Sequence, residues 1–405
     1  MLVELSIMPA QVREASFPFR SVSTTGGTGT VASQFHKVLL SQVPHVERIT
    51  TTCRDMRSER AKRLPASPRV SVLPRAVDDM NVLRGVVDGG EIVYHLAAWL
   101  ANTPLPSMTE VYVVNTLVTA VLSRLCADQD KRLVFTSSHS VYFAGEYRGL
   151  IREEDYAFRR DFVEWINVVN GDYRELVDAI VAGGRSFGEA RDVIFRIHAK
   201  LPPPFDPKIY DSDSYHIYCL TKLLAERLVL DNGGIVLRLS NVYRPGDESP
   251  QAVSEACHRL LEADPADRIA VTQRFKKLVP AYLGDIIKVF IRMGRLRLPE
   301  SALPVFTIAS QEHYMREDEL LRTVATCLNE IRGTNQDHDI EELPAEDDVA
   351  FSYDLTKMKT HLLRTEEMTP FSKGVREQLL WLMERAQGRP AREADVVISF
   401  DEDGV

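Results

Sequence analysis

Cysteine is scarce in this sequence, and positive charge is in deficit. The 405 residues contain five scattered cysteines, too few and too irregular for a disulfide framework, so we expect free thiols in a reducing cytoplasm. The ten histidines are scattered as well, and no Cys/His pair has the spacing of metal ligands, so no metal site is predicted. The formal net charge of -9 argues against general nucleic-acid binding, which needs a basic face.

Long apolar runs are also missing. By composition, no run approaches the roughly 18 residues that a membrane-spanning helix needs. The first 20 residues lack a basic start followed by an apolar core, so no secretory signal is expected. We therefore predict a cytoplasmic protein without a membrane partner. The hydrophobic content of 44% suits one large α/β unit or two domains with ample core.

A strand, a glycine-rich turn and a helix are predicted in succession near the N-terminus. Residues 17–24 indicate a short strand, Thr25-Gly-Gly-Thr-Gly29 follows at once, and apolar residues then recur at helical spacing up to Leu39. Gly26 permits a tight turn, and Gly29 lets the backbone approach a pyrophosphate at the amino end of the helix. This order favours a dinucleotide site, and an ordinary glycine-rich turn is the alternative.

The second strand, expected over residues 46–52, ends in a basic segment. Arg54 precedes Asp55, and further Arg and Lys residues follow. A carboxylate here would bind the ribose hydroxyls of NAD, whereas an arginine pairs with the 2′-phosphate of NADP. Arg54 therefore favours NADP, while Asp55 leaves NAD open and a solvated charged loop remains the structural alternative.

The next strands are expected to end beside a ligand. After a strand candidate at residues 69–77, residues 91–99 form a buried strand that ends in small side chains, which leave room in the crevice above a sheet. Within it, His95 is interpreted as a packed core histidine. A long apolar helix over 111–126 contains Asn115. Residues 131–142 form another strand that opens into a hydroxyl-rich loop, and a hydroxyl there can hydrogen-bond a substrate oxygen.

Tyr218 and Lys222 lie in a predicted helix over residues 214–228. Side chains four residues apart share a helical face. An ammonium beside a phenol lowers the pKa of the phenol and prepares it for acid/base work. The spacing alone also occurs by chance in many helices, so its meaning depends on the rest of the chain.

Taken in order, six segments resemble the extended short-chain dehydrogenase/reductase superfamily, in particular its sugar-nucleotide epimerases and dehydratases. They are Thr25-Gly-Gly-Thr-Gly29, His95-Leu-Ala-Ala98, Thr136-Ser-Ser-x-x-Val-Tyr142, Tyr218-x-x-x-Lys222, Leu237-Arg-Leu-Ser-Asn-Val-Tyr-x-Pro-Gly246 and Thr369-Pro-Phe-x-x-Gly374. The resemblance spans roughly residues 17 to 387. It implies an α/β fold with a doubly wound parallel Rossmann sheet, a smaller C-terminal substrate domain and an NAD(P)-dependent enzyme.

The resemblance also implies roles for individual residues. Tyr218 would be the general acid/base, Lys222 would hold the nicotinamide ribose and depress the pKa of Tyr218, and Ser138 would hydrogen-bond the reacting oxygen. Asn115 would order the lysine and its water. The implied cofactor contacts are Gly26, Thr28, Gly29, Thr30, Val31, Arg54, Val77, Leu96, Ala97 and Ala98, besides Tyr218 and Lys222. The implied substrate contacts are Ser140, Asn241, Arg244 and Lys277.

Several departures from the family pattern stand out. Arg244 replaces the usual glycine, Ala76 stands where an acidic residue usually meets the adenine, and Leu278 replaces an expected arginine, with Lys277 just upstream. The largest departure is a stretch of 79 residues between Ser138 and Tyr218, more than a strand–helix crossover needs. We interpret residues 146–213 as a helical insertion that serves as a lid, a specificity element, a subunit contact or mere surface decoration.

The expected organisation is an N-terminal extension at 1–16, a Rossmann domain at 17–240, a substrate domain at 241–387 with 280–310 returning to the sheet, and an acidic tail at 388–405. An epimerase of a nucleotide-linked sugar is the leading hypothesis. A 4,6-dehydratase is disfavoured because His139-Ser140 replaces the Asp-Glu pair of that class. A reductase of a keto sugar or other carbonyl compound and a catalytically silent nucleotide-binding protein remain alternatives. A homodimer through the helices of Asn115 and Tyr218 is a family expectation.

Overall fold

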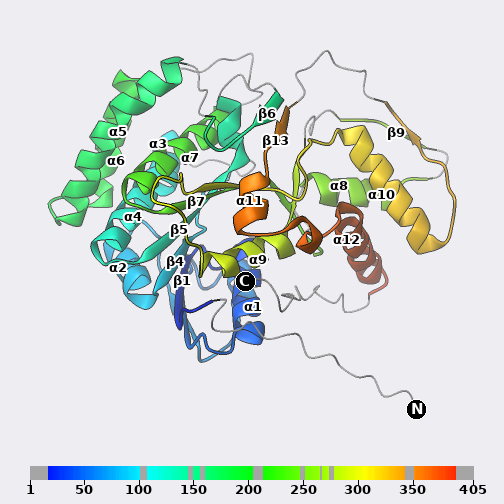
Figure 1. Ribbon diagram of the computed structural model, residues 1–405, viewed down its shortest axis with the longest axis horizontal. Coiled ribbons are helices and arrows are strands. Elements are labelled where there is room, and N and C mark those ends of the chain that lie inside the picture. The colour runs from blue at the N-terminus through cyan, green and yellow to red at the C-terminus, as the bar shows by residue number, and fades with distance from the viewer. Residues whose placement is uncertain are drawn as a thin grey trace.

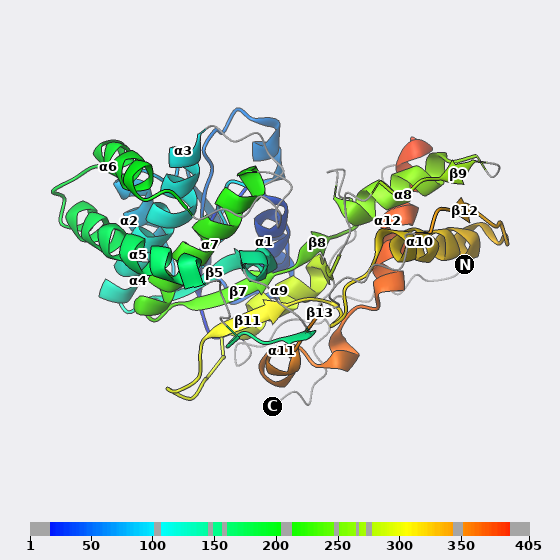
Figure 2. The same cartoon turned by 90° about the horizontal axis from the view of Figure 1, so that it is seen from above.

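The computed structural model describes residues 17–100, 107–144, 149–155, 160–203, 213–246, 251–264, 267–272, 278–342 and 351–388. The expected extension at 1–16 and nearly all of the expected tail lie outside these residues. Figures 1 and 2 show an α/β body with a separate group of helices at its C-terminal side.

A seven-stranded sheet in the order β11-β7-β5-β4-β1-β2-β3 forms the centre of the molecule. All of its strand pairs are parallel. The predicted doubly wound Rossmann fold is therefore confirmed. The strands are β1 (Ser21–Thr25), β2 (Arg48–Thr52), β3 (Val70–Leu73), β4 (Ile92–His95), β5 (Arg132–Ser138), β7 (Ile235–Leu239) and β11 (Val305–Ile308).

Helices cover both faces of the sheet, as the apolar runs of the buried strands require. One core cluster joins the sheet to α1 (Thr30–Gln42), α9 (Leu283–Met293) and α11 (Thr356–His361). The other joins it to α2 (Met80–Gly89), α3 (Met108–Tyr112), α4 (Val118–Asp128) and α7 (Asp213–Asp231). A π-helical turn, Val113–Leu117, connects α3 to α4.

The stretch Met108–Asp128 is long and apolar enough to cross a membrane, with a hydropathy of 1.3 in its most apolar window. The prediction that no apolar run approaches membrane-spanning length was therefore wrong. Because 78% of that window is buried inside the protein, the stretch has the character of a core helix.

The insertion consists of α5 (Arg160–Val181) and α6 (Phe187–Lys200). α5 runs through Gly171 without a break. The helix continues because Asn170 and Tyr173, on either side of that point, are both buried. The break comes at Gly183, which has a φ of 77°, and Ser186 then starts α6 with a capping box to Glu189.

The insertion also begins later than predicted. Residues 149–151 form β6 (Gly149–Ile151), which pairs in parallel with β13 (Phe351–Tyr353) about 200 residues further along the chain. These residues therefore connect to the C-terminal part of the molecule and do not belong to the helical insertion.

The C-terminal part has a core cluster of its own, built from α8 (Ala252–Glu262), α10 (Glu317–Arg332) and α12 (Phe371–Ala386). It joins the Rossmann part through β8 (Asn241–Tyr243) and β10 (Pro280–Tyr282), which pair in parallel. A third short pair, β9 (Arg268–Ile269) with β12 (Asp339–Ile340), lies beside α10. In Figure 1 these helices stand apart from the sheet, at the opposite end from α5 and α6.

Candidate active site

The site is expected where the strand order reverses, between β1 and β4. Successive connections leave these two strands toward opposite faces of the sheet, which opens a crevice above their carboxyl ends. The turn after β1 and the segment after β4 meet at this point, because Gly26 approaches Ala97 there.

Gly26 shows why a glycine is required in the turn. Its φ is 69°, and a Cβ at this position would lie 3.0 Å from both the N and the Cα of Ala97. The Gly26 amide donates to Thr52 Oγ1 at 2.9 Å, and the Gly27 amide donates to the Thr52 carbonyl at 3.0 Å. The turn is thus held by β2 and pressed against the end of β4.

Gly29 is the N-cap of α1 and has no side-chain cap. The first amides of α1 are therefore available at the positive end of the helix dipole, as a phosphate group would need. Thr28, Thr30 and Val31 surround this end and are only partly buried. The predicted glycine contacts and the helix end thus fit a dinucleotide pyrophosphate.

A buried hydrogen-bond chain runs behind the turn. Thr25 Oγ1 accepts from the amides of Leu96 and Ala97, both at 3.0 Å. It therefore donates its one hydrogen to His95 Nδ1 at 2.7 Å. His95 Nε2 lies 2.8 Å from Thr119 Oγ1. Because Thr119 already donates to the Asn115 carbonyl, His95 must donate through Nε2.

The hydrogen bonds to Thr25 and Thr119 fix the tautomer of His95. Burial, with the nearby Lys222 charge as a smaller cause, lowers the pKa of His95 to about 3. The imidazole is neutral and fully buried, so the interpretation as a packed core histidine holds. The sequence did not reveal the partners of this histidine, because threonines are common in strands and helices.

Asn115 lies in the π-helical turn and connects two parts of the site. Its Oδ1 accepts from the Trp99 amide at 2.8 Å, and its Nδ2 donates to the Trp99 carbonyl at 3.0 Å. Nδ2 also lies 3.2 Å from Thr221 Oγ1 on α7. The predicted link to Lys222 is therefore not direct: the side chain holds the neighbouring Thr221 and the segment after β4.

Tyr218 and Ser138 come together although they are 80 positions apart in the sequence. The Ser138 hydroxyl lies close enough to the phenol to lower the pKa of Tyr218. Burial has the larger effect and raises the pKa of Tyr218 to about 12. The phenol is thus protonated at neutral pH in the ligand-free chain.

Lys222 is almost fully buried, and its Nζ donates to the Thr136 carbonyl at 2.9 Å. Nζ lies 6.0 Å from the centre of the Tyr218 ring and 4.8 Å from that of Phe135. Burial lowers the pKa of Lys222 to about 7. Burial is the largest cause of the pKa shift of both groups, and the effect of Lys222 on the pKa of Tyr218 stays a prediction.

A buried ion pair that the sequence reasoning missed lies one turn beyond Lys222. Glu226 accepts from Arg238 Nη2 at 2.8 Å, and both side chains are about 1% exposed. Ser137 Oγ donates to the same carboxylate at 2.5 Å. The negative charge of Glu226 raises the pKa of Lys222 against the effect of burial. In the sequence, the spacing Lys222-x-x-x-Glu226 was the one signal that could have placed Glu226 near Lys222.

The loop after β5 does not present all of its polar groups to the crevice. His139 Nδ1 lies 2.8 Å from the Tyr353 hydroxyl on β13, and burial lowers the pKa of His139 to about 4. Ser140, predicted to bind substrate, is 2% exposed and faces Cys219 on α7. Its amide donates to Ser138 Oγ at 3.2 Å. Ser138 is thus the hydroxyl of this loop that meets Tyr218.

The other predicted cofactor contacts line the carboxyl ends of the strands. Val77 is partly buried after β3, and Leu96 and Ala98 are partly buried after β4. Arg54 is exposed after β2, and its guanidinium lies 5.1 Å from the centre of the Trp99 ring. Arg54 therefore reaches from the end of β2 to the segment after β4.

The substrate side is less complete. Asn241 Oδ1 accepts from the Val279 amide at 3.1 Å, so the side chain already stabilises the pairing of β8 with β10. Arg244 is half-buried beside Gly246 and Trp381. Lys277 lies outside the described residues. Within the described part of the chain, no three His, Cys, Asp or Glu side chains gather as a metal site would require.

These features define a class: a Rossmann-fold protein with a glycine-rich turn after β1, and with Ser138 on β5 close to Tyr218 on α7, the helix that also carries Lys222. Within that class, residues 22–160 match the model of the NAD dependent epimerase/dehydratase family. No curated protein sequence matches the chain.

Solved structures show the same fold. UDP-glucuronic acid 4-epimerase from Bacillus cereus, in complex with NAD, is 16% identical with a TM-score of 0.60, covering 91% of this chain and 99% of that one. The Bordetella bronchiseptica enzyme WbmG, in complex with NAD and UDP, is 17% identical with a TM-score of 0.58, covering 95% and 97%. dTDP-glucose 4,6-dehydratase from Bacillus anthracis, in complex with NAD, is 16% identical with a TM-score of 0.58, covering 91% and 98%. The predicted fold is therefore confirmed, and the match over residues 22–160 agrees with the predicted family.

Proposed function

We propose that this chain is an NAD(P)-dependent epimerase of a nucleotide-linked sugar. The observation that carries the proposal is the approach of the Ser138 hydroxyl to the Tyr218 phenol, with Lys222 one turn away on the same helix and a glycine turn packed against the end of β4. The similarity to enzymes solved with NAD and with UDP supports the choice of cofactor and substrate class.

A bound nicotinamide would supply reversible hydride transfer at the sugar carbon. The residues of this chain handle the proton. Tyr218 starts protonated, because burial raises its pKa to about 12. A positive charge beside the phenol lowers the pKa of Tyr218. The deprotonated phenol can then accept the proton of the sugar hydroxyl. Ser138 orients the oxygen of the same sugar hydroxyl. Lys222 is held in position by the hydrogen bond from its Nζ to the Thr136 carbonyl. Epimerisation then needs only a pocket in which the keto sugar turns over.

The surroundings of β5 argue against elimination of water. His139 replaces the first acid of the dehydratase pair and is directed to Tyr353. Ser140, at the second position, is buried against Cys219. Neither side chain can exchange a proton with a sugar in the crevice.

The proposed location is a reducing cytoplasm, which suits five buried free thiols.

A reductase of a keto sugar or other carbonyl compound is the second candidate. The exposed Arg54 after β2 favours it, because an arginine there pairs with the 2′-phosphate of NADP, and NADP(H) suits an enzyme that exchanges its cofactor in each cycle.

The decisive test is Tyr218→Phe, with turnover of UDP-sugars and cofactor binding measured on the same protein. We expect turnover to fall by about 10²–10⁴-fold, as for a lost general acid/base, with cofactor affinity within a few-fold of the parent. Tyr112→Phe is the matched control, because the Tyr112 hydroxyl is buried with no partner among the described residues. It should leave turnover unchanged.

Two outcomes would contradict the proposal. Unchanged turnover in Tyr218→Phe would remove the acid/base role. Mass spectrometry can detect a nicotinamide dinucleotide released when the purified chain is denatured, or bound after incubation with NAD or NADP. If neither is found, the chain is a catalytically silent fold. Net consumption of NADPH with a free keto sugar would select the reductase over the epimerase.

A further inference from the structure

The helices α5 and α6 cover the outer surface of α4 and α7. In Figures 1 and 2 they lie on the side of these helices that faces away from the sheet. α5 packs against both α4 and α7, and α6 packs against α3 and the π-helical turn. The sheet, the inner helices and this hairpin thus form successive layers within one chain.

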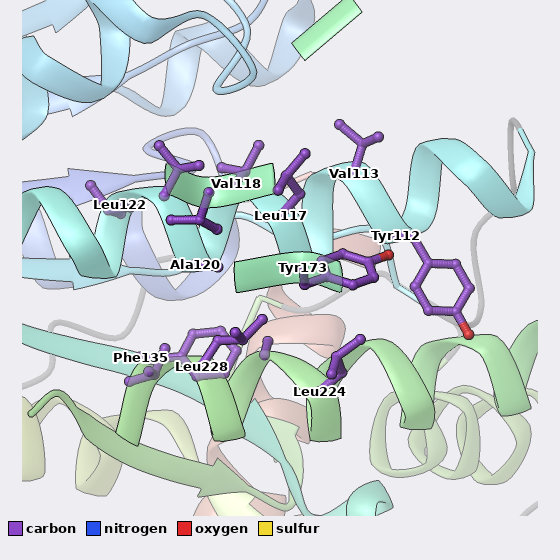
Figure 3. Packing of buried hydrophobic residues seen from close by; sticks show 14 of the residues in the cluster. Tyr112, Val113, Leu117, Val118, Ala120, Leu122, Phe135, Tyr173, Leu224 and Leu228 are labelled. Atoms are coloured by element: carbon purple, nitrogen blue, oxygen red, sulfur yellow. The ribbon is translucent and has the colours of Figure 1, made fainter. Parts of the chain in front are cut away.

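The contact is continuous and apolar. The buried residues of α5 are Phe162, Trp165, Ile166, Val169, Asn170, Tyr173, Leu176, Val177 and Ile180. Most of them belong to the same core cluster as α4 and α7. Figure 3 shows the ring of Tyr173 between the helix that carries Val113 and Leu117 and the helix that carries Leu224. The hairpin therefore belongs to the main core and is not surface decoration.

Polar bonds fix the position of α6 as well. His198 stacks on Tyr112 with ring centres 3.9 Å apart, and its Nε2 lies 3.1 Å from the Tyr173 hydroxyl. Arg191 donates to Asp78, next to the predicted cofactor contact Val77, and to Glu110 on α3, each at 2.5 Å. These bonds tie the hairpin to the rim of the crevice and to the helix of Asn115.

The opposite side of the hairpin has a different character. The exposed residues of α5 are mainly charged: Arg160, Asp161, Glu164, Asp172, Arg174, Glu175 and Asp178. Val168 and Phe195 are the large apolar side chains that the two helices expose, at 59% and 61%. A stable interface buries about 800 Å² on each partner with an apolar centre, and two exposed apolar side chains among charged neighbours do not provide one.

We propose that α5 and α6 take the place of a second copy of this chain, so that the protein is a monomer. The helices of Asn115 and Tyr218 were expected to form a homodimer with the same helices of a partner. That surface is already covered from within the chain, and the covering hairpin ends in a charged face. The catalytic helix is thereby supported without a partner, whichever reaction the site performs.

The first test is the mass of the full chain in solution, by light scattering and sedimentation equilibrium from about 1 to 100 μM. The result expected is a single species of 45.7 kDa, with an unfolding temperature independent of concentration. A species of twice that mass would overturn the proposal. Hydrogen exchange supplies a second measurement: amides of α5 should be protected as strongly as those of α4, and rapid exchange throughout α5 would also overturn it.

Two valines on α5 provide a matched pair. Val177→Asp places a charge on the inner side, where the side chain is 5% exposed, and Val168→Asp places one on the outer side, at 59% exposure. The first should loosen the hairpin, lower the unfolding temperature by several degrees and raise the mass at high concentration. Val168→Asp should change neither the unfolding temperature nor the mass. A fall in mass caused by Val168→Asp would show that the outer face is an interface and contradict the proposal.

Discussion

The cofactor half and the substrate half of this molecule are built differently. Around the proposed cofactor crevice, the segments that follow neighbouring strands of one sheet meet, and Gly26, Thr25 and Ala97 lie within hydrogen-bonding or van der Waals distance of one another. On the substrate side, Asn241 is held by Val279 from a distant segment, and Lys277 lies outside the described residues. A short motif can define the first half, because its geometry is local. The second half depends on segments that meet only in the folded chain.

The largest effect expected in the cofactor half is that of Gly26→Val. Its φ of 69° and the 3.0 Å approach of Ala97 leave no space for a side chain, so the turn must move. We expect the affinity for NAD or NADP, measured by calorimetry, to fall by at least about 100-fold, equivalent to about 2.7 kcal/mol. Binding of UDP alone, which belongs to the substrate half, should change little.

Gly233→Ala separates backbone strain from the close approach. Gly233 also has a positive φ, 74°, but a Cβ there would meet nothing within 4 Å. This variant should lose roughly 1 kcal/mol of stability and bind the cofactor normally. If Gly26→Val bound NAD as tightly as the parent, the crevice between β1 and β4 would not be the cofactor site.

Glu226→Gln tests the buried ion pair that lies one turn beyond Lys222 on α7. Glu226 is not at the reacting atoms, but it raises the pKa of Lys222 and pairs with Arg238. Losing the carboxylate charge should move the pKa of Lys222 further below about 7. If the protonated lysine is the active form, the alkaline limb of the kcat profile moves to lower pH. At pH 7 we expect kcat to fall by about 10-fold.

The control for this change is Glu175→Gln, an exposed position on α5, which should leave both the rate and its pH dependence as they are. Loss of stability alone, because Arg238 is left with an uncompensated charge, would lower the unfolding temperature without moving the pH profile. An unchanged profile would therefore reduce Glu226 to a structural role.

Much of the fold and part of the site could be predicted from the sequence, for physical reasons that differ by residue. The glycine turn and the pair Tyr218 and Lys222 depend on backbone conformation and helical spacing, which are local. The pairing of Glu226 with Arg238 depends on how α7 packs on β7, so spacing alone could not reveal it. The pairing of β6 with β13 joins segments about 200 residues apart. The pKa of Tyr218 is raised mainly by burial, which a sequence does not show.

The smallest effect expected concerns the choice between NAD and NADP within the cofactor half. Arg54 lies at the end of β2 with its guanidinium over Trp99. Arg54→Ala should weaken NADP binding by about 5–30-fold, because a charge-assisted phosphate contact contributes about 1–2 kcal/mol at an exposed site, and should leave NAD binding unchanged. Arg60→Ala, exposed in the same segment, is the control. Because the Arg54 guanidinium lies over the Trp99 ring, we expect NADP to change the fluorescence of Trp99 more than NAD does. Equal losses for both cofactors would show that Arg54 supports the crevice as a whole and does not read the 2′-phosphate.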